Sequence, residues 1–164
     1  MVNIIKPRKI KAPKFISSFF KKKNSSECLK SSDFQFKRKV AVIAHRGFSG
    51  VAPENTMSSF IKAVESDADM IELDVTLSKD GEVVVIHDKT LNRTTKTKGK
   101  VLDFTLEELK KLDAGSWFSS EFKDEKIPTL DEVLAYTKDK ILVNIEIKKY
   151  SVKRLKKHDG IEEN

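Results

Sequence analysis

Two histidines lie where short apolar runs of this sequence end. His45 follows the apolar run 40–44, and His87 follows the run 83–86. Imidazoles titrate near neutral pH when unperturbed, so one can take up a proton while another releases one. Cleavage of a phosphodiester needs a base for the nucleophile and an acid for the leaving alkoxide. The two histidines are therefore candidates for proton transfer at such a bond.

Three carboxylates could gather near these histidines. Glu72 and Asp74 are two residues apart in the predicted strand 70–77, so their side chains point to one face. Glu146, in the predicted strand 141–147, can complete the set. Without a metal, such carboxylates would repel one another and raise each other's pKa values. The pattern predicts a site for a divalent metal ion, Ca²⁺ or Mg²⁺. The alternative is that the alternating acids are exposed positions of an amphipathic strand.

A β-α-β unit is predicted to place the first of these side chains. A strand over 40–44 is followed by a helix that begins after Thr56, the predicted N-cap, and runs to about Ser66. The chain then enters the strand 70–77. The carboxyl ends of such strands are where barrel enzymes build their sites.

A hairpin is predicted to return the second histidine to the same place. Asp80 and Gly81 form an Asp-Gly turn, which supplies the positive φ that tight hairpins require. The run 83–86 then leads back, so that His87 approaches Glu72 and Asp74.

The segment 80–128 is too long for an ordinary connection between a strand and a helix. Residues 88–100 are polar and predict a loop, and two helices are predicted to begin after Thr105 and Thr129, each with a glutamate three residues on as in a capping box. Trp117 and Phe118 either pack a small core in this segment or form an aromatic lip.

Four short motifs follow one another in the order HRG, PENT, ExD and HD, and further matches run through LNRTTKTKGKVLDFTLEELKKLDAGSWF, IPTLDEVLAY and VNIEIK. This pattern resembles the glycerophosphodiester phosphodiesterases over Ala41 to Lys148. So many ordered matches make chance agreement implausible, although HRG or HD alone would be a weak signal.

The resemblance implies hydrolysis of glycerophosphodiesters to glycerol 3-phosphate and an alcohol, with a role for each motif residue. It makes His45 and His87 the catalytic pair. It implies that the metal ligands are Glu72, Asp74 and Glu146. It implies that the phosphate is bound by Arg46 and Lys148. The supporting residues are then Glu54 and Asn55. The alternatives are that Arg46 and Lys148 are ordinary surface charges, and that Glu54 is a further metal ligand rather than a structural partner.

The resemblance also implies an α/β fold, the N-terminal portion of a TIM-type (β/α)8 barrel with the family's insertion subdomain at about 80–128. A whole barrel needs about 250 residues, whereas residues 40–149 contain only three predicted barrel strands. We therefore expect a truncated domain that needs the missing half of the barrel. The alternatives are an inactive fragment, or a related phosphodiesterase that acts on another lipid-derived diester.

Positive charge is concentrated in the leader, residues 1–39. The leader holds 12 Lys and Arg against Glu27 and Asp33, which gives it a net charge of +10. The whole chain has a net charge of +7, so the remaining residues carry −3. A nucleic-acid partner is not expected, because no basic stripe with stacking aromatics follows in the body of the chain. The leader is expected to be a disordered arm; the alternative is that KFISSFFKKK contacts an anionic membrane surface.

The remaining features are consistent with a cytoplasmic protein, with peripheral membrane contact as the variant. Cys28 is the only cysteine, so no internal disulfide can form. No apolar run approaches the roughly 18 residues of a membrane span. The tail 150–164 is strongly charged, and His158 within it is expected to be solvated.

Overall fold

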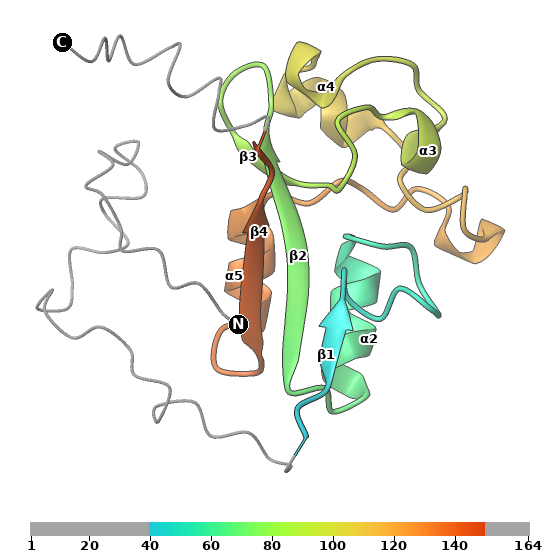
Figure 1. Cartoon of the computed structure of the whole chain (residues 1–164). Helices are drawn as coiled ribbons and strands as arrows, with labels where there is room; N and C mark the ends of the chain where they lie inside the picture. The colour runs from blue at the N-terminus through green and yellow to red at the C-terminus, as the bar shows by residue number, and fades with distance from the viewer. Residues whose placement is uncertain (1–39, 150–164) are drawn as a thin grey trace, which may run out of the picture. The chain divides into compact units, whose positions relative to one another are not determined.

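The computed structural model describes residues 40–149, and its centre is a small sheet in which the strand β2 (Met70–Leu77) is shared by all pairings (Figure 1). β1 (Ile43–His45) and β4 (Leu142–Ile147) run parallel to β2, with Glu72 paired to both His45 and Asn144. β3 (Val83–Val85) runs antiparallel to the end of β2. The parallel order β1-β2-β4 is that of consecutive strands in a barrel.

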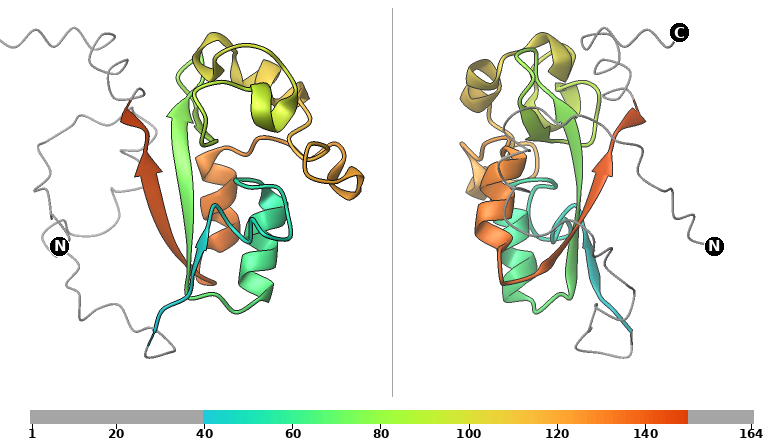
Figure 2. Two further views of the ribbon diagram at one scale, coloured as in Figure 1. Left: turned by 45° about the vertical axis from the view of Figure 1, so that its right-hand side comes forward. Right: turned by 90° about the vertical axis from the view of Figure 1, so that its left-hand side faces the viewer.

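Two helices cover one face of this sheet (Figure 2). They are α2 (Met57–Glu65) and α5 (Leu130–Thr137), and each begins with a capping box, at Thr56 and at Thr129, as the sequence predicted. Their buried apolar side chains pack on alternate residues of β2, and the shared core consists of Phe60, Ala63, Ile71, Leu73, Val75, Val85 and Val133. Full burial of one such aliphatic side chain stabilises the fold by about 1.5–3 kcal/mol.

The opposite face of the sheet is polar. Because successive side chains of a strand alternate, packing Leu73 and Val75 under the helices turns Glu72, Asp74 and Thr76 the other way. In the parallel register Asp74 lies beside Glu146, so β4 presents its own polar residues on that face. Hydrophobic packing on one side of the sheet thus selects the residues that face the other side.

The predicted Asp-Gly hairpin is present between β2 and β3. Gly81 has φ +89°, and Val75 pairs with Val85 beyond the turn. The segment then stays beside β2, because the Ile86 N–H donates to the Asp74 carbonyl at 2.9 Å. This bond brings the residue that follows, His87, to the end of β2 from which Asp74 projects.

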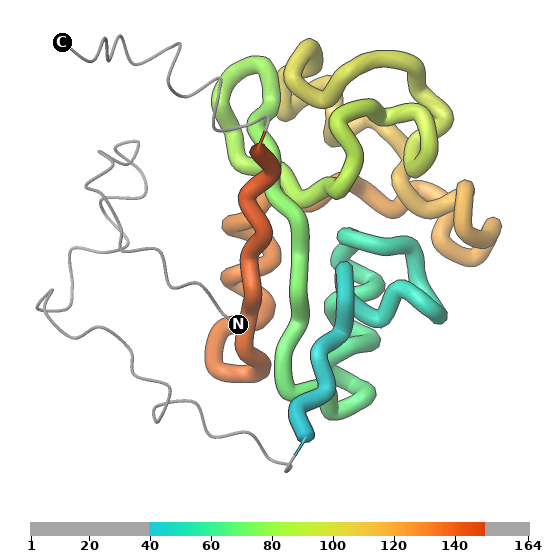
Figure 3. The backbone as a smooth tube through the Cα atoms, in the orientation of Figure 1, coloured from blue at the N-terminus to red at the C-terminus, as the bar shows by residue number. Residues whose placement is uncertain are grey.

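The segment between β3 and α5 contributes to a second core. Figure 3 shows the backbone path of this segment. Its elements are α3 (Asn92–Thr95), the 3-10 helices η2 (Val101–Asp103) and η3 (Ser120–Phe122), and α4 (Leu106–Lys111) with the predicted cap at Thr105. The prediction of a plain loop over 88–100 was wrong, since α3 forms there. Buried Leu91 anchors it, and the Thr95 N–H donates to the Leu91 carbonyl at 3.0 Å.

Three strand boundaries differ from the sequence prediction: the start of β1, its end at His45 rather than at residue 44, and the start of β4. β1 begins at Ile43 rather than residue 40, because Val40 has no strand partner and is 75% exposed. β4 begins at Leu142 rather than residue 141. Within the described range β4 pairs only with β2, and Ile147 on its far end is 63% exposed. The predictions for the leader and the tail lie outside the described residues.

Over residues 40–149, no helix has both the length and the apolar composition needed to cross a membrane.

Candidate functional site

Three carboxylates converge on the polar face of the sheet. Glu72, Asp74 and Glu146 each offer one oxygen, and these atoms lie within 4.8 Å of one another. Glu72 and Asp74 are buried, whereas the side chain of Glu146 is 55% exposed. The convergence that the sequence predicted requires all three residues to share a face, and the parallel register of β2 with β4 provides this.

The donor set fits a hard divalent cation. Ca²⁺ and Mg²⁺ bind oxygen ligands at about 2.0–2.6 Å, so two ligands of one ion lie at most about 5 Å apart. The carboxylate oxygens of Glu72, Asp74 and Glu146 meet this limit. Glu72 and Asp74 are buried and have lost most of their hydration. A bound cation compensates for this loss.

A lysine pairs with two of the three clustered carboxylates. Lys148 Nζ lies 2.7 Å from Asp74 Oδ1 and 2.7 Å from Glu146 Oε1, and its side chain is 11% exposed. Burial acts to raise the pKa of Asp74, but hydrogen bonds from Lys148 and Asn55 bring that pKa below its usual value. The expectation that repulsion would raise the pKa is therefore wrong for Asp74. Burial acts to lower the pKa of Lys148, but hydrogen bonds to Asp74 and Glu146 raise that pKa above its usual value.

Asn55 holds Asp74 from the other side. Its Nδ2 donates to Asp74 Oδ2 at 2.8 Å, and its Oδ1 accepts from the Asp74 N–H at 3.3 Å. Asn55 adopts φ +56°, a conformation that asparagine tolerates better than most residues. The hydrogen-bonding role predicted for Asn55 has this contact as its geometric basis.

The HRG motif forms a left-handed turn at the end of β1. Arg46 has φ +57° and Gly47 has φ +77°. A Cβ at Gly47 would lie 2.3 Å from Ser59 Oγ, so any side chain there would collide with α2. The turn points the Arg46 N–H at Glu72 Oε2, at 3.0 Å, and thereby fixes the orientation of that carboxylate.

The side chain of Arg46 lies between two carboxylates. Nη1 donates to Glu54 Oε1 at 3.0 Å, and Nε lies 3.5 Å from Asp74 Oδ2. Glu54 is absent from the cluster around Asp74 and instead engages arginines, which favours its structural role over metal binding. Burial acts to raise the pKa of Glu54, but Arg93 and Arg46 lower it below its usual value.

The two histidines occupy different environments. His45 ends β1 beside Glu72, with Nε2 3.8 Å from Glu72 Oε2, and its side chain is 67% exposed. His87 follows β3 and is 32% exposed, and its Nδ1 lies 2.7 Å from Asp88 Oδ1. One imidazole is open to an incoming group, while the other is fixed by a carboxylate.

Sequence reasoning missed Arg93 as part of the site. Its guanidinium bridges Glu54 and Asp88, from a short helix that was predicted to be a loop. A hydrogen bond from Arg93, followed by one from His87, outweighs burial and lowers the pKa of Asp88 to about 2. The LNRTT motif contained the residue, but nothing in the local pattern indicated partners far along the chain.

The aromatic residues of the AGSWF motif contact one another. Trp117 and Phe118 lie edge to face at 5.7 Å, and Phe118 makes the same contact with Phe122. Trp117 Nε1 donates to the Ala114 carbonyl at 2.9 Å. These contacts favour a packing role, and the aromatic lip stays a prediction.

Comparison with known proteins identifies relatives over most of the described residues. The family model of the glycerophosphoryl diester phosphodiesterase family matches residues 45–164. A glycerophosphodiester phosphodiesterase of Caldanaerobacter subterraneus is 60% identical over 111 residues, which cover 67% of this chain and 46% of the relative.

Solved structures agree with this similarity. A glycerophosphodiester phosphodiesterase of Agrobacterium tumefaciens superposes with a TM-score of 0.65 at 41% identity, over 74% of this chain and 54% of the other. A phosphodiesterase of Oleispira antarctica, in complex with the product sn-glycerol-3-phosphate, superposes with a TM-score of 0.65 at 45% identity, over 66% of this chain and 44% of the other.

The chain therefore spans about half the length of the proteins it matches. The predicted α/β fold class, the N-terminal portion of a (β/α)8 barrel, is confirmed. The family model matches the segment that holds the clustered carboxylates and histidines, and this chain belongs to the glycerophosphoryl diester phosphodiesterase family.

Proposed function

We propose that the protein hydrolyses glycerophosphodiesters to glycerol 3-phosphate and an alcohol, as a metal-dependent enzyme of lipid and glycerol metabolism. The convergence of Glu72, Asp74 and Glu146 beside His45 supports this proposal most directly. The Oleispira relative, which holds sn-glycerol-3-phosphate, supports the class of product.

Glu72, Asp74 and Glu146 would hold a divalent ion, Ca²⁺ or Mg²⁺. When bound, the ion supplies positive charge to the nonbridging oxygens of the substrate. Arg46 and Lys148 add charge from the chain itself. Lys148 now pairs with two of the proposed ligands, so once their charge is shared with a cation it is free to turn to the phosphate.

His45 and His87 transfer the protons. A carboxylate only accepts hydrogen bonds, so the contact of Asp88 with His87 Nδ1 places a proton on Nδ1. The lone pair of neutral His87 is then on Nε2. At this atom the imidazole takes up a proton from the reacting group, or returns one to it. His45, largely exposed at the end of β1, serves the other oxygen as the second member of the acid–base pair.

The experiment that tests this function compares the 164-residue chain alone with the chain co-expressed with the part of the Caldanaerobacter relative that it does not match, here called the complemented form. We expect metal-dependent release of glycerol 3-phosphate from glycerophosphocholine only from the complemented form. The reason is that β4 lacks a second partner among the described residues and exposes Ile145 and Ile147.

Amide exchange measured on both samples shows whether the partner strands protect β4. Release by the chain alone would contradict the need for the missing half while supporting the activity. No release by a complemented form in which β4 is protected would contradict the proposed activity.

We also propose that the protein is cytoplasmic with a solvated leader; the alternative is that the leader contacts anionic membrane surfaces. If residues 1–26, which hold eight Lys and Arg and no acidic residue, act electrostatically, binding to vesicles that contain phosphatidylserine should fall as salt rises. Deletion of residues 1–26 should abolish this binding, as measured by co-sedimentation. Equal binding to neutral vesicles at high salt would contradict an electrostatic contact, and absence of binding would support a solvated arm.

A further inference from the structure

Arg93 joins two parts of the site through one guanidinium group. Nε and Nη2 donate to Asp88 at 2.8 and 3.2 Å, and Nη1 and Nη2 donate to Glu54 at 2.8 and 2.7 Å. All three nitrogens are therefore engaged by two carboxylates. The guanidinium carbon also lies 5.8 Å from the ring centroid of Trp117. Planar bidentate pairing of this kind fixes geometry as well as charge.

One arm of this arrangement ends at His87. Asp88 accepts from Arg93 on both of its oxygens, and its Oδ1 also lies 2.7 Å from His87 Nδ1. A carboxylate held by a guanidinium cannot turn freely away from the imidazole beside it. The imidazole is thereby kept with its Nδ1 towards Asp88, so that in the neutral ring the proton is on Nδ1 and the lone pair on Nε2, the tautomer in which Nε2 can accept a proton.

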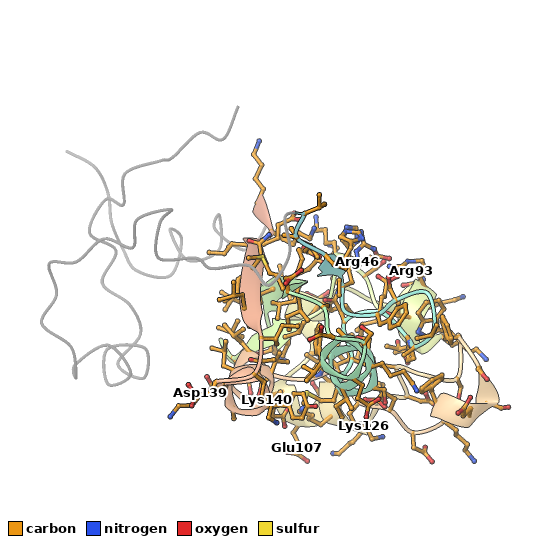
Figure 4. All side chains as sticks on the ribbon, turned by 90° about the horizontal axis from the view of Figure 1, so that it is seen from below. Arg46, Arg93, Glu107, Lys126, Asp139 and Lys140 are labelled. Carbon is orange, nitrogen blue, oxygen red and sulfur yellow. The ribbon has the colours of Figure 1, made fainter. Side chains whose placement is uncertain are left out.

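The other arm ends at Arg46. Glu54 Oε1 accepts from Arg93 Nη2 at 2.7 Å and from Arg46 Nη1 at 3.0 Å. The side chain of Glu54 is only 12% exposed, so its charge is shared between two arginines rather than with water. The two arginines come together from the β1 end and from α3 (Figure 4).

We propose that Arg93 is a positioning residue for the reaction, which fixes the tautomer of His87 through Asp88 and the direction of Arg46 through Glu54. This inference rests on the proposed function for its catalytic consequence. The structural part of the inference concerns the imidazole and can be measured without turnover.

The first test is ¹⁵N nuclear magnetic resonance of the histidine side chains in the complemented form, at a pH where the imidazoles are neutral. The chain has three histidines, so His87→Gln assigns the signal. We expect His87 to be protonated at Nδ1 in the parent, and to exchange between tautomers in Arg93→Ala and in Arg93→Lys. Lysine keeps the charge but cannot hold two carboxylates in one plane.

Matched variants separate this role from general loss of structure. Lys111→Ala removes an exposed cation that pairs only with Glu107 in the described contacts, and it should leave the His87 signal unchanged. Guanidinium ion at a non-denaturing concentration should restore the single tautomer in Arg93→Ala, whereas methylammonium should not. An unfolded variant could not be rescued in this way.

The second test is kinetic. Arg93→Ala should lower kcat of the complemented form by about 10- to 100-fold, the size of effect that misplacement of a catalytic group produces. Asp88→Ala should lower kcat to a similar degree, and the double variant should add little, because both changes release the same imidazole. Glu54→Gln should act mainly on KM, through Arg46, and keep the His87 tautomer.

Two results would overturn the proposal. One is a His87 ring that stays protonated at Nδ1 in folded Arg93→Ala but loses this form in Asp88→Ala, since Asp88 would then act without Arg93. The other is a parent ring that is protonated at Nε2. If the tautomer changes as expected while the complemented form hydrolyses no glycerophosphodiester, the positioning role stands and the proposed function fails.

Discussion

Replacement of His45 or His87 with alanine is expected to lower kcat of the complemented form on glycerophosphocholine by a factor of about 10² or more. His87 has its Nδ1 held by Asp88 at 2.7 Å, and His45 lies beside Glu72. Loss of either imidazole removes a proton acceptor or donor that water replaces poorly. Steady-state kinetics with saturating metal ion measures the effect.

A control distinguishes proton transfer from metal binding. Neither histidine belongs to the group of three residues that could hold the metal ion. Titration calorimetry should therefore find the affinity for the divalent ion largely retained in both alanine variants. A His45 or His87 variant with nearly normal kcat would show that the residue has no role in proton transfer. A large loss of metal affinity in His45→Ala would instead indicate that His45 acts as a ligand.

Removal of the buried Asp74 carboxylate is expected to lower both metal affinity and turnover strongly. In Asp74→Asn the ion loses its most buried ligand, which is 1% exposed, and the positive charge at the substrate oxygens falls with it. Such charge is worth several kcal/mol in the transition state, so we expect a loss of kcat/KM of at least about 10³-fold. Calorimetric titration of the variant with Ca²⁺ or Mg²⁺ measures binding without turnover.

Two further variants guard against misfolding in this test. Asp74 also pairs with Lys148, so its replacement can destabilise the fold. Glu146→Gln alters a proposed ligand whose side chain is 55% exposed and should lower metal affinity with little change in thermal unfolding of the metal-free protein. Glu107→Gln, whose side chain is 82% exposed and remote from the cluster, should change neither property. Parental metal affinity in both Asp74→Asn and Glu146→Gln would refute the metal site.

Much of the fold followed from the local pattern of the chain. β2 has the predicted bounds, the three helix starts at Thr56, Thr105 and Thr129 were found at their caps, and the hairpin turns at Gly81. Each of these features depends on residues within a few positions of one another. Hydrophobic alternation and capping side chains act over that range, so the sequence alone can reveal them.

The alternation of side chains along the predicted strands also predicted which carboxylates share a face of the sheet. Alternation along β2 assigned Glu72 and Asp74 to one face, and the parallel register with β4 brought Glu146 to the same point. That these residues bind a metal ion and that the histidines transfer protons are predictions still to be tested by the variants above.

Contacts between distant residues were decided only by the tertiary structure. The pairing of Lys148 with Asp74 reversed the expected direction of the Asp74 pKa, and Arg93 reached Glu54 from 39 residues away. A sequence names the charges but not the distances between them, and electrostatic energy depends on distance and burial. The residues that could do the chemistry were therefore identifiable from the sequence, whereas the partners that set their charge and orientation required the folded chain.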